Sequence, residues 1–266
     1  MLVSQVIEKI EAFAPVRLAG EWDNVGLMVG DRSGVVKKIL LTLDVDLEVA
    51  REAAREGANL IVSHHPMIFE PLKKINADTR QGECILFLAR NGISFYAAHT
   101  NLDAAEGGLN DYLAGLYGLK EIEPTDIIYT DEQGKKYGLG RLGILPEPMT
   151  LQALAERVAE RLGLPAISYV GNSGTEVRKV AVCSGGGGSR VSSALVEIAD
   201  VYITGDVKYS NARDAQDFGL PLIIAGHYDT EIFCMDIFEK LLSPLGIPLL
   251  RSGANTNVVQ TISLKE

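Results

Sequence analysis

The chain has 266 residues, enough for one or two domains of ordinary size. Hydrophobic residues make up 47% of it and charged residues 23%, a composition that excludes an intrinsically disordered chain. Lys and Arg total 25 against 35 Asp and Glu, so the formal net charge is −10; this argues against general attraction to nucleic acid but leaves room for a local basic patch.

The amino-terminal half alternates short apolar segments with amphipathic helices. Apolar side chains between Leu2 and Phe13 share one helical face, and Pro15 ends that helix. Strands separated by helices of ten to fifteen residues predict right-handed crossovers and a largely parallel sheet. The expected strands are 37–45, 59–63 and 93–98, and the expected helices are 46–57, 81–92 and 107–118.

The middle of the chain changes character before the alternation resumes. Two strand-like segments, 126–130 and 137–145, flank a polar stretch with a glycine, which predicts a hairpin. An amphipathic helix follows over 151–163. The remaining expected strands are 167–171, 177–183, 201–205, 220–226 and 256–264, and the remaining helices are 189–200, 209–219 and 230–242.

These patterns predict two α/β domains with largely parallel sheets. We expect the first domain to comprise 1–125 plus 226–266 and the second to comprise 126–225. The return of the last segment to the first domain is favoured by the chemistry of the strand ends described below, since pattern alone does not decide it.

The cysteines and the amino terminus bear on the compartment. Cys84, Cys183 and Cys234 are odd in number, widely spaced and set among apolar neighbours, which predicts buried free thiols rather than disulfides or a cysteine-built zinc site. The first residues lack the basic-then-apolar order of a signal peptide, and no apolar run reaches the ~18 residues of a membrane span. We therefore expect a soluble cytoplasmic protein without a membrane partner.

All four histidines follow predicted strands. His64 and His65 end the strand at 59–63, His99 follows 93–98, and His227 follows 220–226. In open α/β sheets, ligands bind beyond the carboxyl ends of the strands. We therefore expect the histidines to gather at a functional edge.

The spacing of these histidines is typical of a metal site. Pro66 interrupts the strand directly after His64 and His65, so both imidazoles can turn toward one centre. His227 and Glu231 stand four residues apart at a helix start, on one face.

With Asp103, whose short carboxylate suits a bridge, these residues make five candidate ligands, a number better matched to two divalent ions than to one. Imidazole and carboxylate ligands suit zinc, manganese, iron, cobalt or nickel. His99 is the weakest candidate ligand; its alternative role is to orient Asp103 or to donate a proton to substrate.

The sequence also resembles a known family. The matching segments, in the family's order, are LAGEWDNVGLMVGD (18–31), TLDV (42–45), SHHPMIF (63–69), AAHTNLDAAEGGLND (97–111), CSGGGGS (183–189), ADVYITGDVKY (199–209) and AGHYDTE (225–231). The chain is similar to the NIF-three-like dinuclear metal proteins, which are often called GTP cyclohydrolase I type 2 homologues. The resemblance implies that the metals are held by His64, His65, Asp103, His227 and Glu231 in the cleft between the two domains, and that the protein forms a toroidal homohexamer.

Two interpretations of function remain open. The first is a metal-dependent hydrolase acting on a nucleotide-like or phosphorylated small molecule, with His99 and Glu231 as catalytic residues. The alternative is a non-catalytic hexameric scaffold that binds metal or other proteins. Nucleic acid is a less favoured partner because of the acidic charge.

Three further motifs each allow two readings. The glycine run 184–189 is either a phosphate cradle at a helix start or a tight turn with close chain approach. Trp22 either packs beneath an Asp-Asn turn or stacks on a base beside the site. Asp206 and Lys208 either bind substrate or cap the next helix.

Overall fold

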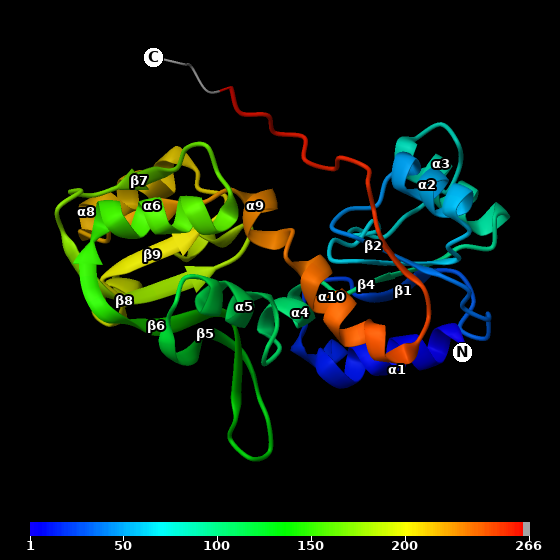
Figure 1. The fold of residues 1–266 in the computed structure, drawn as a ribbon, viewed down its shortest axis with the longest axis horizontal. Helices are drawn as coiled ribbons and strands as arrows, with labels where there is room; N and C mark the ends of the chain where they lie inside the picture. The colour runs from blue at the N-terminus through cyan, green and yellow to red at the C-terminus, as the bar shows by residue number, and fades with distance from the viewer. Residues whose placement is uncertain (263–266) are drawn as a thin grey trace. The chain divides into compact units, whose positions relative to one another are not determined.

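A computed structural model describes residues 1–262 and divides into two compact units, which we treat separately (Figure 1). Unit 1 comprises Met1–Glu106 and Ile232–Val258, and unit 2 comprises Gly107–Glu231 with residues 259–262. Each unit is a sheet with helices packed against it, so the predicted α/β class is confirmed.

Unit 1 is built on a five-stranded sheet in the order β1-β4-β3-β2-β11. Its strands are β1 (Gly26–Val29), β2 (Ile39–Thr42), β3 (Leu60–Ser63), β4 (Ser94–Ala97) and β11 (Leu249–Arg251). Its helices are α1 (Val3–Phe13), α2 (Leu47–Glu56), α3 (Arg80–Arg90), α4 (Thr100–Ala104) and α10 (Cys234–Leu242), with 3-10 turns at Val16–Leu18 and Ser243–Leu245.

The sheet of unit 1 is buried on both faces. Helices α2 and α3 cover one face, and α1 and α10 cover the other (Figure 1). Consequently β2, β3 and β4 are buried at every position, as the continuous apolar runs of their sequences predict. Four strands, β11, β2, β3 and β4, pair with one another in parallel, and β1 pairs antiparallel with β4 at the edge of the sheet. On one face, Leu40, Ile61 and Phe95 pack against the apolar side of α2 and α3.

Unit 2 is built on a six-stranded sheet in the order β5-β6-β8-β9-β10-β7. Its strands are β5 (Lys120–Thr130), β6 (Lys136–Thr150), β7 (Ser168–Val170), β8 (Glu176–Cys183), β9 (Val201–Thr204) and β10 (Leu222–Ile224). Its helices are α5 (Leu109–Leu116), α6 (Leu151–Leu162), α7 (Ser193–Ile198), α8 (Tyr209–Phe218) and α9 (His227–Glu231), with a 3-10 turn at Gly187–Arg190.

The sheet of unit 2 is mixed rather than largely parallel. Only β8, β9 and β10 pair in parallel. The predicted hairpin is present as β5 and β6, and it adds two antiparallel pairings; β7 adds a third. The difference arises because a hairpin joins adjacent antiparallel strands, whereas only the later crossovers generate parallel neighbours.

The units divide at different residues from the domains expected from sequence, 1–125 plus 226–266 and 126–225. The first division falls after Glu106, because α5 and β5 pack with β6 of unit 2. The second falls after Glu231, where the expected helix 230–242 is interrupted between α9 and α10.

The carboxyl-terminal segment also differs from its prediction. The expected strand 256–264 is not formed over its described part, 256–262, where Val258 and Val259 are exposed; residues 263–264 lie outside the described part of the chain. The last strand of the described chain is β11, which the sequence pattern did not predict and which pairs in parallel with β2. The segment after β11 is tied to α2, since the buried carboxylate of Glu52 accepts hydrogen bonds from Ser252 Oγ and from the amide of Gly253 at 2.8 Å.

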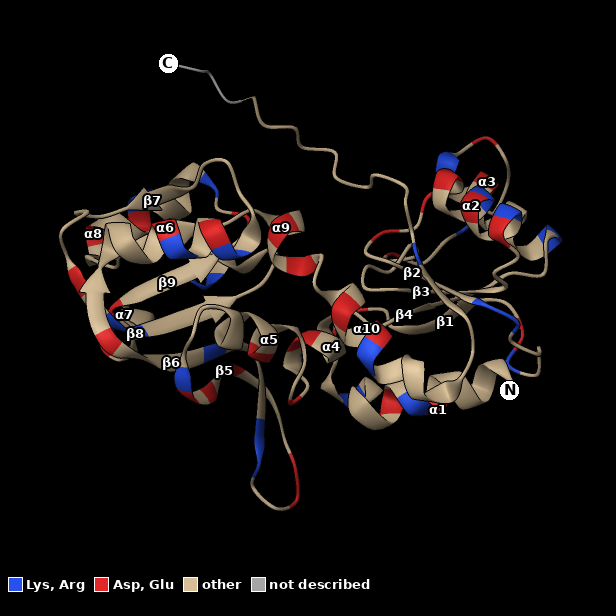
Figure 2. Ribbon diagram, in the orientation of Figure 1, with Lys and Arg blue, Asp and Glu red and all other residues tan. Residues whose placement is uncertain are grey.

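Other sequence expectations concern cysteines and surface charge. All three cysteines are buried and free, as predicted, and burial raises the pKa of the Cys84 thiol to about 11. Among residues 1–262, no helix combines the length and apolar character needed to cross a bilayer. Lys and Arg alternate with Asp and Glu along helices such as α2 and α6 (Figure 2).

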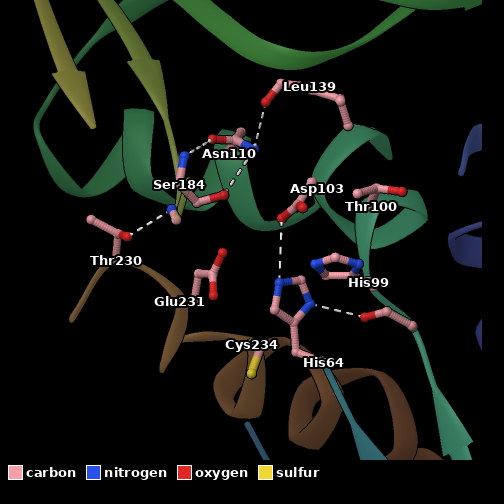
Figure 3. Close-up of polar contacts among 12 residues, drawn as sticks. His64, His99, Thr100, Asp103, Asn110, Leu139, Ser184, Thr230, Glu231 and Cys234 are labelled. Carbon is pink, nitrogen blue, oxygen red and sulfur yellow. Dashed lines mark hydrogen bonds and ion pairs between the residues drawn. The ribbon is translucent and has the colours of Figure 1, made fainter. Parts of the chain in front are cut away.

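Asn110 supplies a stability test for unit 2. Its buried amide donates to Leu139 O at 2.9 Å and to Ser184 Oγ at 3.2 Å, and accepts from Ser184 N at 2.8 Å, so it joins α5 to β6 and to the end of β8 (Figure 3). We expect Asn110→Ala to lower the free energy of unfolding by about 1–3 kcal/mol, because it strips partners from buried polar groups. Urea unfolding followed by circular dichroism measures this.

The matched control is Asn255→Ala, at an exposed position, which should change the free energy of unfolding by no more than about 0.5 kcal/mol. Equal effects of the two substitutions would contradict the role assigned to Asn110.

Candidate metal centre

Unit 1 gathers its three histidines through strand register. Strands β3 and β4 are parallel, with Ser63 opposite Ala97, so the residues that follow them emerge at the same edge. The amide of Ala98 donates to Ser63 O at 3.0 Å, and the amide of His65 donates to Leu43 O at 2.9 Å. These bonds hold both chain ends beside the sheet as the strands finish.

The three imidazoles form one cluster. One ring nitrogen from each of His64, His65 and His99 lies within 4.8 Å of the others. Asp103, one turn along α4, places Oδ1 3.6 Å from Nε2 of the fully buried His64 (Figure 3). This is a donor set of imidazole and carboxylate groups converging on a small volume, which suits a divalent transition metal.

Each imidazole of the cluster is oriented through Nδ1. His64 Nδ1 donates to Ala98 O at 2.9 Å, His65 Nδ1 to Asp44 Oδ1 at 2.7 Å, and His99 Nδ1 to Asp23 Oδ1 at 2.9 Å. Carbonyl and carboxylate oxygens can only accept, so the hydrogen resides on Nδ1 and the lone pair on Nε2. This is the tautomer that metal-binding histidines require.

Asp23 is the most strongly held of these acceptors. Its side chain is buried, and it accepts from His99, from the amide of Thr100 at 3.1 Å and from the Thr100 hydroxyl. Burial acts to raise the pKa of Asp23, but the hydrogen bond and charge of His99, together with the bonds from Thr100, outweigh it and leave the pKa below its ordinary value. Asp23 is therefore a fixed anion behind His99.

Unit 2 carries the other histidine in a similar arrangement. His227 and Glu231 lie one turn apart in α9. The Nε2 atom of His227 lies 2.9 Å from Glu231 Oε2, and its Nδ1 atom lies 2.7 Å from Asp206 Oδ2. The hydrogen bond to Glu231 raises the pKa of His227 to about 9; burial opposes this, and the charges of Glu231 and Asp206 add to it. The same contact between Nε2 and the Glu231 carboxylate favours the protonated imidazole of His227.

The glycine run packs closely on this pair. Gly185 has a φ of +56°, and a Cβ there would lie 1.9 Å from Glu231 Oε1 and 3.1 Å from His227 Nε2. Its amide donates to Thr230 Oγ1 at 3.0 Å (Figure 3). Cβ atoms at Gly187 and Gly188 would also collide with neighbouring groups of unit 2, 2.3 and 2.4 Å away. The run therefore serves close chain approach, the second of its two readings.

The expected ligands are thus divided between the units. His64, His65 and Asp103 lie together on unit 1 and are joined there by His99, whereas His227 and Glu231 lie together on unit 2. Asp206 contacts His227, a role other than the two expected for it.

Sequence reasoning missed Asp23 and Asp44. The signal that could have found Asp44 is its place two residues beyond the end of β2, at the same sheet edge as His65.

The pKa of His227 tests the geometry of unit 2. In chelator-treated protein, we expect its imidazole to titrate near pH 9, because the neighbouring carboxylates stabilise the protonated form. Glu231→Gln removes the carboxylate that contributes most to the raised pKa and should lower the midpoint toward the ordinary value of about 6.5. NMR of the imidazole Cε1–H resonances follows this titration; an unchanged midpoint in Glu231→Gln would contradict the arrangement.

Gly185 and its neighbour Gly186 form a matched pair for a second test. Gly186 has ordinary negative φ, and a Cβ there would meet nothing within 4 Å. Gly185→Ala should displace the Glu231 carboxylate and lower the His227 pKa, whereas Gly186→Ala should leave it unchanged. The same NMR titration reads out both variants, and equal behaviour would refute the assigned close contact.

Known proteins resemble this chain over nearly its whole length. The model of the Duf34/NIF3 (NGG1p interacting factor 3) family matches residues 1–257. A "GTP cyclohydrolase 1 type 2 homolog" of Lactococcus lactis is 39% identical, covering 97% of this chain and 98% of that one. A Bacillus cereus protein related to NIF3 superposes with a TM-score of 0.89 at 27% identity, covering 98% and 99% of the two chains, and the Staphylococcus aureus protein SA1388 with 0.88 at 29%, with the same coverage. The chain belongs to the Duf34/NIF3 family.

Proposed function

We propose that this protein is a metal-dependent hydrolase with a dinuclear centre, acting on a nucleotide-like or phosphorylated small molecule. The observation that carries the proposal is the cluster of three histidines whose Nδ1 atoms are all held by oxygen acceptors. Imidazoles that carry hydrogen on Nδ1 and a lone pair on Nε2 are oriented to bind a metal, which packing alone would not require.

The proposed ligands are His64, His65 and Asp103 from unit 1 with His227 and Glu231 from unit 2. Support comes from the number of donors: His227 and Glu231 are paired with each other in α9, and two ligands are fewer than the three or four usual for these metals, so the pair needs partners from elsewhere in the chain. We therefore propose that both groups supply ligands to one centre. Its ions would be two divalent cations of the zinc, manganese, iron, cobalt or nickel type.

Divalent ions held by such a set supply Lewis-acid chemistry, making a water molecule acidic enough to attack at neutral pH and polarising the electrophile. The name that related proteins carry, GTP cyclohydrolase 1 type 2 homolog, makes a ring carbon of a nucleotide one candidate electrophile. A phosphoester is the other.

His99 and Glu231 are the proposed catalytic residues. His99 carries a fixed hydrogen on Nδ1 through Asp23, so its Nε2 is available to accept a proton from the attacking water and return it to the leaving group. Glu231 stands at the His227 nitrogen as a hydrogen-bond acceptor and is positioned by the Gly185 turn.

Metal content and turnover test the proposal together. Protein purified without added metal should contain about two divalent ions per chain, and the same sample should hydrolyse a member of a panel of nucleotides, phosphoesters and cyclic amides. His65→Ala should lose metal, and Asp44→Asn should weaken metal binding by about 10–100-fold, because Asp44 orients a ligand. Glu48→Gln, an exposed carboxylate of α2, is the control and should change neither quantity.

His99→Gln separates the two roles of that residue. Retained metal with reduced kcat identifies proton transfer, whereas loss of an ion identifies a ligand. If the metal-loaded protein turns over nothing, and chelation dissolves the homohexamer in light scattering, the hydrolase is refuted and the non-catalytic scaffold is supported.

A further inference from the structure

We propose that Trp22 and Phe69 form a binding surface for a planar heteroaromatic ring, and that this surface selects the substrate. The inference rests on the proposed function in calling the bound molecule a substrate. It assigns to the aromatic pair a role in specificity, separate from the metal ligands.

Both side chains are exposed although they are large and apolar. Trp22 is 59% exposed and Phe69 is 42% exposed, and their ring centroids lie 6.1 Å apart with the planes tilted by 49°. Exposed aromatic area is costly in water, and such pairs are characteristic of binding sites. Trp22 therefore does not serve the packing role that its position beside an Asp-Asn turn first suggested.

The aromatic pair is held in place by the segments on which it is carried. Asp23, adjacent to Trp22, is bonded to His99 and Thr100, and the amide of Gly20 donates to Thr100 Oγ1 at 2.9 Å. On the other side, the side-chain amide nitrogen Nδ2 of Asn24 donates to the carbonyl of Ile68, next to Phe69. The backbones that present the two rings are thus tied to each other and to the histidine loop.

The indole of Trp22 also packs against the backbone of Gly20. A Cβ at Gly20 would lie 2.9, 3.0 and 3.1 Å from Cε2, Nε1 and Cζ2 of Trp22, so one side of the ring rests against the Gly20 backbone. The exposed remainder is therefore presented in a fixed direction, which lowers the entropy lost when a ligand stacks on it.

The position of the pair beside the histidine cluster indicates the occupant. The His99 ring lies 6.4 Å from the indole and 6.5 Å from the Phe69 ring between centroids, edge-on to both. A ring stacked on the aromatic pair would thus lie next to the histidine nitrogens, where its heteroatoms and ring carbons meet polar groups. A nitrogen heterocycle fits this position, because its apolar face can stack on the two aromatic rings while the polar atoms at its edge lie beside His99.

Trp22 is the only tryptophan of the chain, so its fluorescence reports directly on this surface. We would titrate the metal-containing protein with guanosine and adenosine monophosphates and, separately, with ribose 5-phosphate. We expect saturable quenching by the two monophosphates and no change with ribose 5-phosphate. Equal responses to all three would overturn the proposal, because phosphate rather than the ring would then be recognised.

Substitutions test the same point by equilibrium dialysis of the monophosphates. Trp22→Leu and Phe69→Leu should each weaken binding by about 10-fold, given the usual contribution of one stacking contact. Gly20→Ala, which keeps the indole but displaces it, should weaken binding as well. Tyr209→Leu removes an even more exposed aromatic side chain (81%) from unit 2 and should have no effect. Unchanged binding in both Trp22→Leu and Phe69→Leu would overturn the proposal.

The outcomes separate this inference from the hydrolase proposal. Ring binding that quenches Trp22 without any turnover supports the aromatic surface and refutes the hydrolase. Turnover of a phosphoester lacking an aromatic ring, unaffected by Trp22→Leu, supports the hydrolase and overturns the aromatic surface. Trp22 emission that depends on protein concentration and ignores the monophosphates would show that a second copy of the chain covers the pair, which also overturns it.

Discussion

The hydrogen bond at Nδ1 is the interaction on which the candidate centre depends. It recurs at all four histidines, with a carbonyl behind His64 and carboxylates behind His65, His99 and His227. Each bond fixes the direction of the ring and leaves Nε2 as the nitrogen that can face a metal. Three of the four bonds therefore require an acid, and the fold supplies these acids from turns that follow β2, β9 and the 3-10 turn at Val16–Leu18.

The two units bring their candidate ligands together with different local structures. Unit 1 aligns its histidines by parallel strand register, whereas unit 2 places His227 and Glu231 one turn apart on a short helix. In unit 2 the backbone passes so close to the Glu231 carboxylate that a residue with a side chain would collide with it. Gly185 has no side chain and adopts the left-handed backbone conformation found there. Thus the strand register of unit 1 and the glycine run of unit 2 both position candidate metal ligands.

Much of this could be predicted from sequence, because apolar runs and helical periodicity are local signals. The strand ends, and with them the positions of the histidines at a sheet edge, followed from such signals. The partners of the histidines did not, since Asp23 lies 76 residues from His99 and Asp44 lies 21 residues from His65, and only the folded sheet brings them together. The interruption between α9 and α10 was missed for a similar reason: the apolar pattern runs on across Ile232 and Phe233, while the chain passes from one compact unit to the other.

The alignment of β3 with β4 has a consequence for how this chain can change length. A residue deleted inside either strand would shift the pairing of Ser63 with Ala97 and turn alternate side chains to the opposite face, carrying the histidines out of the cluster. Residues 70–79 are nearly all exposed and join the histidine loop to α3 without contributing a strand. Insertions and deletions among family members should therefore concentrate in that loop and spare the two short strands beside it.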